Sequence, residues 1–416
     1  MTTTRIGIEF AKRRLDTGLT VIAVRNPDVP TASMSVSLRV GQLDEADGED
    51  GLAYLTGSCL EEGTQRLDAV AQAEAVESIG GSLSTTSAGA RIACPADQVE
   101  LGCELLRETV LEPGFRTEDI ERIKREIVAE IVADAEDPSS VAQHRFQAEV
   151  YGTHPFARPG YGTRVAVESF TRDDLERFHA KWYRPAEGYV ALAGPFETDR
   201  GLDLLESTFA RFRGLPIEEP RFEAPTLPDV TVRHHIAMPR EQVHVCLGHI
   251  GVRRNDPDYH ALLVMDHVLG AGAGFTARIP RRLRDEAGLC YSVGSSITNT
   301  AGLEPGTFRA YIGTSPEHRE TAVEGFLDEI RKIRSEPPTL EEVQVAQDYL
   351  AGSFVLGLER TSSLVTFAVR VERHGLGFDY LREFPRMVRA VRAAEIREVA
   401  ERHLHPDRVV VVSAGA

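Results

Sequence analysis

Two side chains in the second half of this 416-residue sequence could act together on a carbonyl group. Arg284 and Tyr291 stand seven residues apart in the segment Arg-Asp-Glu-Ala-Gly-Leu-Cys-Tyr. A guanidinium and a phenol both donate hydrogen bonds, so together they can bind a substrate carbonyl and stabilise the oxyanion of a tetrahedral intermediate. The alternative interpretation is a surface arginine and a core tyrosine with no chemical role.

A glycine-rich segment precedes this pair. Gly270, Gly272 and Gly274 would let backbone approach a bound peptide closely, because glycine carries no Cβ. No Lys-Ser or Lys-Thr follows, so the segment does not predict a phosphate-binding loop. A flexible loop explains these glycines equally well.

An internal repeat organises the elements around these residues. Residues 175–185 and 396–406 each predict an amphipathic helix that ends before a proline, ten residues after the first apolar position. An apolar strand follows in each copy, at 189–194 and 409–415, and its glycine stands nine residues after the proline. Thr171, followed by two aspartates, is a suitable start for the first helix.

A second pair of matching stretches, 34–41 and 243–251, alternates with the period of a half-buried strand. Both pairs occur in the same order, which indicates two homologous domains. We place them at 1–214 and 229–416, joined by a proline-rich linker at 215–228. Strands separated by long helices predict an α+β fold, in which helices cover one face of a mainly antiparallel sheet in each domain.

Composition limits the classes of partner. The net charge of −17 argues against nucleic acid, and no apolar run is long enough to span a membrane. The N-terminus shows no secretory h-region, and the five widely spaced cysteines predict reduced thiols, so we expect a cytoplasmic protein. Acidic side chains lining a chamber would favour basic peptides; alternatively, they only keep the protein soluble.

The stretch 51–64 reads Gly-Leu-Ala-Tyr-Leu-Thr-Gly-Ser-Cys-Leu-Glu-Glu-Gly-Thr. Together with Arg284 and Tyr291, it resembles the insulinase and pitrilysin-type zinc peptidases and the mitochondrial processing peptidase. In that family a stretch of the same length reads Gly-x-Ala-His-Phe-Leu-Glu-His-x-x-x-x-Gly-Thr and contains the zinc motif His-x-x-Glu-His. The C-terminal half of the family carries the substrate-binding Arg and Tyr.

The zinc motif is degenerate in this sequence. Tyr54 and Ser58 stand where the resemblance places the two histidine ligands, and Gly57 stands at the catalytic glutamate. A phenol and a hydroxyl are poor neutral zinc ligands, and glycine offers no general base. Glu130 holds the place of the third ligand, where it is either a family relic or a solvated carboxylate. We therefore expect no cofactor on this chain.

Other metal sites are weakly supported. His244, Cys246 and His249 lie on one predicted strand, where the first two share a face and His249 points the other way. Asp266 and His267 fall in the second-half helix equivalent to the lost motif, but Leu263 occupies the place of its first histidine.

The segment that begins at Gly80 resembles the edge strand that pairs with substrate backbone in active family members. Ser84 and Thr85 replace an Asn-Ala pair there. Backbone pairing does not depend on those side chains, so the resemblance implies that peptide could still lie along this strand.

The resemblance implies a half-length, non-catalytic subunit of a heterodimeric peptidase. Its partner would be a homologous chain of similar length that carries the zinc, and its substrates would be small unfolded peptides. Arg284 and Tyr291 would then contribute to the partner's active site. The alternatives are a non-enzymatic scaffold, a peptide-binding homodimer without catalysis, and an enzyme with an unorthodox metal site.

Overall fold

A computed structural model describes residues 2–3, 8–214, 218, 220–272 and 276–416. The chain forms two compact units. Unit 1 comprises Met1–Ile131, Pro159–Arg221 and Leu356–Tyr380, and unit 2 comprises Val132–Arg158, Phe222–Val355 and Leu381–Ala416. The units therefore depart from the two consecutive halves expected from the sequence. The expected linker lies partly outside the described residues.

The sheet of unit 1 has the order β1-β2-β3-β7-β4-β6-β5. The sheet of unit 2 has the order β8-β12-β9-β11-β10 when read from its parallel pair. The strands of unit 1 are β1 (Thr2–Thr3), β2 (Glu9–Arg14), β3 (Thr20–Arg25), β4 (Thr31–Ser37), β5 (Ser82–Thr86), β6 (Gly89–Pro95) and β7 (Tyr189–Gly194). Those of unit 2 are β8 (Val232–Ala237), β9 (Val243–Ile250), β10 (Val293–Ser296), β11 (Thr307–Thr314) and β12 (Val410–Gly415).

The two sheets match strand for strand. Five strands of each sheet correspond. In each set of five, the strands that come first and last in the sequence pair in parallel, β3 with β7 and β8 with β12, and the other pairs are antiparallel. The order β3-β7-β4-β6-β5 is thus repeated as β8-β12-β9-β11-β10. This agreement confirms the α+β class and the two homologous sheets inferred from the sequence repeat.

The helices are divided between the two units. Unit 1 contains α1 (Leu52–Cys59), α2 (Ala69–Ser78), α3 (Val99–Leu111), most of α4 (Thr117–Glu136), α6 (Arg164–Ser169), α7 (Arg172–Trp182), α8 (Thr198–Phe209) and α13 (Thr361–Arg373). Unit 2 contains α5 (Pro138–Tyr151), α9 (Tyr259–Asp266), α10 (Arg278–Pro280), α11 (Arg319–Ser335), most of α12 (Leu340–Leu356), most of α14 (Tyr380–Ala390) and α15 (Ala393–His403). Two π-helical segments, η4 (His267–Ala271) and η5 (Arg281–Glu286), flank α10.

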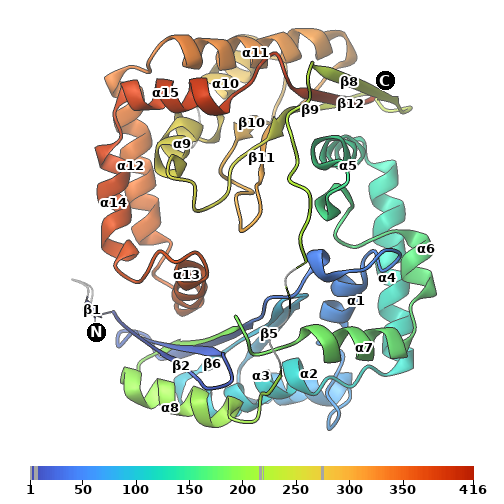
Figure 1. The fold of residues 1–416 in the computed structure, drawn as a ribbon, viewed down its shortest axis with the longest axis vertical. Helices are drawn as coiled ribbons and strands as arrows, with labels where there is room; N and C mark the ends of the chain where they lie inside the picture. The colour runs from blue at the N-terminus through green and yellow to red at the C-terminus, as the bar shows by residue number, and fades with distance from the viewer. Residues whose placement is uncertain (1, 4–7, 215–217, 219, 273–275) are drawn as a thin grey trace. The chain divides into compact units, whose positions relative to one another are not determined.

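Each unit takes one helix from the other half of the chain. The first-half helix α5 packs on β9 and β12 of unit 2, and the second-half helix α13 packs on β4 and β7 of unit 1. Since β4 corresponds to β9 and β7 to β12, the exchange is reciprocal. Figure 1 shows α13 on one side of the unit 1 sheet and α3 and α8 on the other.

Side-chain alternation on β4 explains how both faces of the unit 1 sheet are covered. The Ser33 hydroxyl lies 3.1 Å from that of Thr361 on α13, whereas the sulfur of the next residue, Met34, lies 3.1 Å from that of Cys103 on α3. Neighbouring strand residues point to opposite faces. The predicted helical layer on one face is therefore supplemented by the exchanged helix on the other.

Helix starts agree with their local sequence. Thr171 and Asp174 form a reciprocal capping box at α7, as expected from the sequence. At α5, the Asp137 carboxylate accepts a hydrogen bond of 2.8 Å from the Ser140 backbone N–H, and Pro138 fills the first turn. Three apolar residues one turn apart on α5, Ala142, Phe146 and Val150, are buried against the sheet of unit 2.

Candidate functional site

The degenerate motif lies on α1, and the structure brings its first position to Glu130 of α4. The Tyr54 hydroxyl donates a long hydrogen bond of 3.4 Å to the Glu130 carboxylate. Ser58, one turn further along α1, donates its hydroxyl to the backbone carbonyl of Tyr54 at 3.0 Å. Tyr54 and Glu130, 76 residues apart in the sequence, are thus adjacent in space, as the resemblance implies for the metal ligands of relatives.

The donor atoms at these positions do not fit a zinc ion. Burial, together with the negative charge of Glu130, raises the pKa of Tyr54 above its ordinary value, so the phenol stays protonated. Zinc in proteins is held by thiolate, imidazole or carboxylate. Only Glu130 offers such a group here, and the neutral Tyr54 and Ser58 hydroxyls supply none.

Gly57 also has no room for the glutamate that peptidase chemistry requires. A Cβ on Gly57 would lie 2.4 Å from the backbone nitrogen of Ser87 and 2.6 Å from the carbonyl carbon of Thr86. The helix therefore packs directly on the turn after β5. Any side chain at this position must displace backbone, so the packing of unit 1 itself excludes a general base at position 57.

The equivalent helix of unit 2 places a carboxylate against the corresponding turn. Asp266 is fully buried and accepts hydrogen bonds from the Thr298 hydroxyl at 2.5 Å, the Thr298 N–H at 2.9 Å and the Ile297 N–H at 2.9 Å. The Ser296 hydroxyl donates a further bond of 2.6 Å. Burial raises the pKa of Asp266, and these donors oppose that rise. The carboxylate holds the end of β10 and is not left available to a metal.

The neighbouring histidines have separate partners. His267 donates its Nδ1 hydrogen to the Leu263 carbonyl at 3.0 Å. On β9, His244 Nδ1 lies 2.7 Å from the Tyr311 hydroxyl, whereas His249 is buried and donates from Nδ1 to the Ile250 carbonyl at 2.7 Å. Each of these imidazoles therefore hydrogen-bonds to a different group.

Arg284 and Tyr291 lie around the end of η5 in unit 2. Arg284 Nε donates to the Asp285 carboxylate at 2.9 Å. Tyr291 is 95% exposed, the highest value among the large apolar and aromatic side chains on the described surface. The structure therefore excludes the alternative of a core tyrosine and presents this phenol to solvent.

Two of the three loop glycines are explained by packing. A Cβ on Gly270 would lie 2.2 Å from the Ser295 hydroxyl, and one on Gly272 would lie 2.5 Å from the His267 carbonyl. Both glycines thus allow close contact within unit 2. Gly274 lies outside the described residues.

Ser84 and Thr85 lie on β5, which ends the sheet of unit 1 and, among the described strands, pairs only with β6. Ser84 is opposite Arg91 in the antiparallel register, and the Thr85 hydroxyl lies 3.5 Å from the Glu61 carboxylate. The strand is an edge to which an extended chain could add.

Comparison with known proteins agrees with this geometry. The model of the insulinase family, peptidase family M16, matches residues 20–164, and that of the peptidase M16 inactive domain matches residues 169–350. The chain belongs to the M16 peptidase family. The two matches together leave only a short gap between residues 20 and 350.

Relatives and solved structures of the M16 family cover nearly the whole chain. An uncharacterized zinc protease of Mycobacterium tuberculosis is 29% identical over 408 residues, 95% of this chain and 91% of that protein. One from Streptomyces coelicolor is 28% identical over 374 residues, 86% of this chain and 80% of that protein. A peptidase M16 inactive domain from Pseudomonas fluorescens superposes with a TM-score of 0.90 at 26% identity and 98% coverage of both chains.

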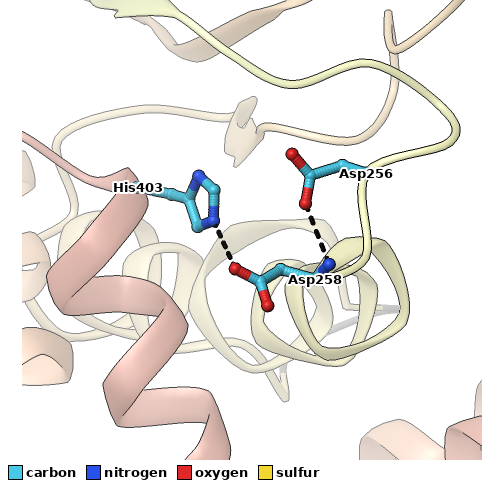
Figure 2. Close-up of side chains that lie close together, drawn as sticks. All are labelled: Asp256, Asp258 and His403. Carbon is cyan, nitrogen blue, oxygen red and sulfur yellow. Dashed lines mark hydrogen bonds and ion pairs between the residues drawn. The ribbon is translucent and has the colours of Figure 1, made fainter.

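A further group of polar side chains in this M16 chain was not found from the sequence. Asp256, Asp258 and His403 each have one side-chain atom that could ligate a metal ion, and these three atoms lie within 4.8 Å of one another (Figure 2). However, Asp258 accepts a hydrogen bond of 2.7 Å from His403 Nε2 and forms an ion pair with Arg402. Asp256 accepts a bond of 2.8 Å from the Asp258 N–H. The group joins the start of α9 to the end of α15.

No single helix in the described ranges combines the length and the apolar character needed to cross a bilayer.

The only sequence signal for the Asp256 group was the Asp-x-Asp spacing, because His403 is 145 residues away from Asp258.

Proposed function

We propose that this chain is the non-catalytic, substrate-binding subunit of a two-chain M16 peptidase. The observation that carries this proposal is Gly57, whose contact with the turn after β5 leaves no space for a catalytic glutamate. The protonated Tyr54 phenol beside Glu130 adds that the remaining donors suit hydrogen bonding better than zinc.

The partner in this proposal is a homologous chain of similar length that carries His-x-x-Glu-His and the zinc ion. Zinc proteases are among the relatives that match this chain over most of its length, which supports a zinc-bearing partner of the same fold. This chain would bind no cofactor of its own. Its five cysteines are free thiols, which fits a reducing compartment such as the cytoplasm.

The proposed contribution of this chain is to bind and polarise small unfolded peptides. Tyr291 presents an exposed phenol, and Arg284 lies seven residues earlier in the same segment. Donors of this kind stabilise the oxyanion that forms at a partner's metal, and loss of one such donor typically lowers the rate about 10²–10³-fold. The open edge at β5 would hold extended substrate backbone.

The test is hydrolysis of a quenched fluorescent peptide by this chain, by the zinc-bearing partner, and by their mixture. We expect activity only in the mixture, and a loss of about 10²-fold or more with Tyr291→Phe or Arg284→Ala. Arg281→Ala is the matched control, because Arg281 lies on the same segment, η5, and its only ion pair among the described residues is with Glu286 at 3.8 Å. This control should leave the rate unchanged.

Other outcomes distinguish the competing functions. Hydrolysis by this chain alone would reveal an unorthodox metal site and refute the proposal. A stable mixture without any activity would favour a scaffold. Peptide binding by a self-associating chain, measured by sedimentation without the partner, would favour a homodimer.

A further inference from the structure

A groove of about 340 Å³ lies in unit 1, beside the edge strand β5. Its floor is formed by β4, β6 and β5, and its wall by α13. The strand register aligns Ser35, Arg91 and Ser84 in one row across the three strands. The next row contains Ser37, Gly89 and Thr86. The groove therefore opens on the face to which Ser84 and Thr86 point.

Every charged or titratable side chain that lines the groove is basic. They are Arg91 of β6, Arg370 and Arg373 of α13, and His374, which follows α13. The other described residues that line it are Ser, Thr, Val and Ala, with no carboxylate among them. This composition is unusual for a chain with 64 acidic and 47 basic residues.

The three guanidinium groups have no carboxylate partner among the residues that the structure describes. None of Arg91, Arg370 and Arg373 forms an ion pair with a residue that the structure describes, although arginines elsewhere in unit 1 commonly do. Unpaired positive charges in a half-enclosed groove attract anions, because low-dielectric walls concentrate their field.

The arginines differ in their structural roles. Arg373 donates to the Ser37 hydroxyl at 2.9 Å and to backbone carbonyls, and it therefore fastens α13 to β4. Arg91 donates to the Thr366 hydroxyl at 2.9 Å, but its buried Nε has no partner in the described part of the chain. Arg370 is exposed, and no described residue hydrogen-bonds to its side chain. Arg91 and Arg370 are thus the groups with unused donors.

A peptide that pairs with β5 would bring its own side chains to this groove. In an added strand, alternate residues point to the same face as Ser84 and Thr86. An aspartate or glutamate at such a position would approach the row that contains Arg91 and the side chain of Arg370. Charge-assisted hydrogen bonds from guanidinium to carboxylate are stronger than neutral ones.

We propose that this groove selects extended peptides with an acidic side chain in the segment that pairs with β5. The inference rests on the proposed function, because it assumes that peptide lies along this strand. It is also opposite to the preference for basic peptides that the overall charge of −17 suggests. The local lining decides the preference, since charges more than about 10 Å away are screened at ordinary ionic strength.

The test is fluorescence anisotropy on the full chain with two labelled, C-terminally amidated peptides. One carries glutamates at alternate positions of an extended sequence, and the other carries glutamines in their place. We expect the glutamate peptide to bind about tenfold more tightly, as one charge-assisted hydrogen bond would give. Arg370→Glu should abolish the difference, and added salt should reduce it.

Arg125→Glu is the matched control, because Arg125 is an exposed arginine of α4 that forms no ion pair with a described residue. It should leave the preference intact. Equal binding of both peptides by the unmodified chain would overturn this inference and leave the proposed peptide-binding function standing. Binding of neither peptide would overturn both. A preference that appears only when the C-terminus is left as a free carboxylate would also overturn the inference, since the groove would then bind chain ends.

Discussion

Substitution of Gly57 tests whether the loss of the zinc motif is fixed by packing. In Gly57→Ala, the new Cβ would lie 2.4–2.6 Å from three backbone atoms of Thr86 and Ser87. Ordinary carbon contacts lie near 3.5 Å, so the overlap is about 1 Å. Backbone cannot rotate away as a side chain can. The turn after β5 must therefore move, or α1 must.

The expected loss of stability follows from two opposing terms. Overpacking a tight site costs about 1–3 kcal/mol, and the upper end applies because the contacts are with backbone. Alanine in a helix gains about 1 kcal/mol over glycine. The net loss is about 2 kcal/mol, which lowers the midpoint of urea unfolding by roughly 0.7 M for a slope of about 3 kcal/mol/M.

Gly352→Ala is the control for the helical term. Gly352 is an exposed residue of α12, and a Cβ there would have no neighbour within 4 Å. It should raise the midpoint by about 0.3 M, as a gain of about 1 kcal/mol predicts. If Gly57→Ala matches this control, α1 has room for a side chain and our explanation is wrong.

Restoring the zinc motif by substitution should also destabilise the chain. A chain with Tyr54→His, Gly57→Glu and Ser58→His carries His-x-x-Glu-His in sequence. We expect it to be less stable than Gly57→Ala and to copurify with no stoichiometric zinc, measured by atomic absorption.

Two further predictions concern stability and assembly. Burial lowers the pKa of His249 to about 4, and its Nε2 accepts a hydrogen bond from the His405 N–H at 3.2 Å, so the folded state holds the neutral imidazole. The neutral imidazole should contribute on the order of 3 kcal/mol to the free energy of unfolding, in full above pH 6.5 and progressively less as the pH falls towards 4. Urea titrations between pH 7.5 and 5 should show this pH dependence in the unmodified chain and a weaker one in His249→Asn. Because α5 and α13 are exchanged, residues 1–214 and 229–416 produced separately should lack cooperative unfolding, whereas coexpressed halves should copurify as a folded complex. Independent folding of either half would contradict the exchange.

Much of the fold could be inferred from local sequence. The proline that ends α7 and the apolar run of β7 recur at α15 and β12, and the alternating pattern of β4 recurs at β9. Such patterns record which elements exist. The exchange of α5 and α13 could not be inferred. The apolar residues on one face of α5 indicate that the helix packs on a sheet, but they do not indicate which sheet.

The candidate site could also be predicted only in part from the sequence. The frame around Tyr54 and the distant Glu130 came from resemblance, and the structure brings them into contact. The groove at Arg91 and Arg370 left no signal, because its arginines are about 280 residues apart and follow no shared period. Asp266 was considered from the sequence only as part of a weakly supported metal site with His267, whereas its role in holding the end of β10 depends on backbone N–H groups that no sequence pattern displays.

The exchange of helices also sets an order of events during synthesis. Helix α5 is made before the sheet of unit 2, but α13 begins 140 residues after Arg221, the end of the preceding unit 1 segment. At about 5–20 residues per second, the α13 face of unit 1 stays uncovered on the ribosome for on the order of ten to thirty seconds.

The face of unit 1 that α13 covers carries both small and large side chains. Under α13, the paired positions are the small residues Ser33 with Ala193 and Ser35 with Ala191. Ile22 and Val24 lie in the same rows, and Phe10 contacts Phe367 of α13, so these apolar side chains remain open to misassociation until α13 is made.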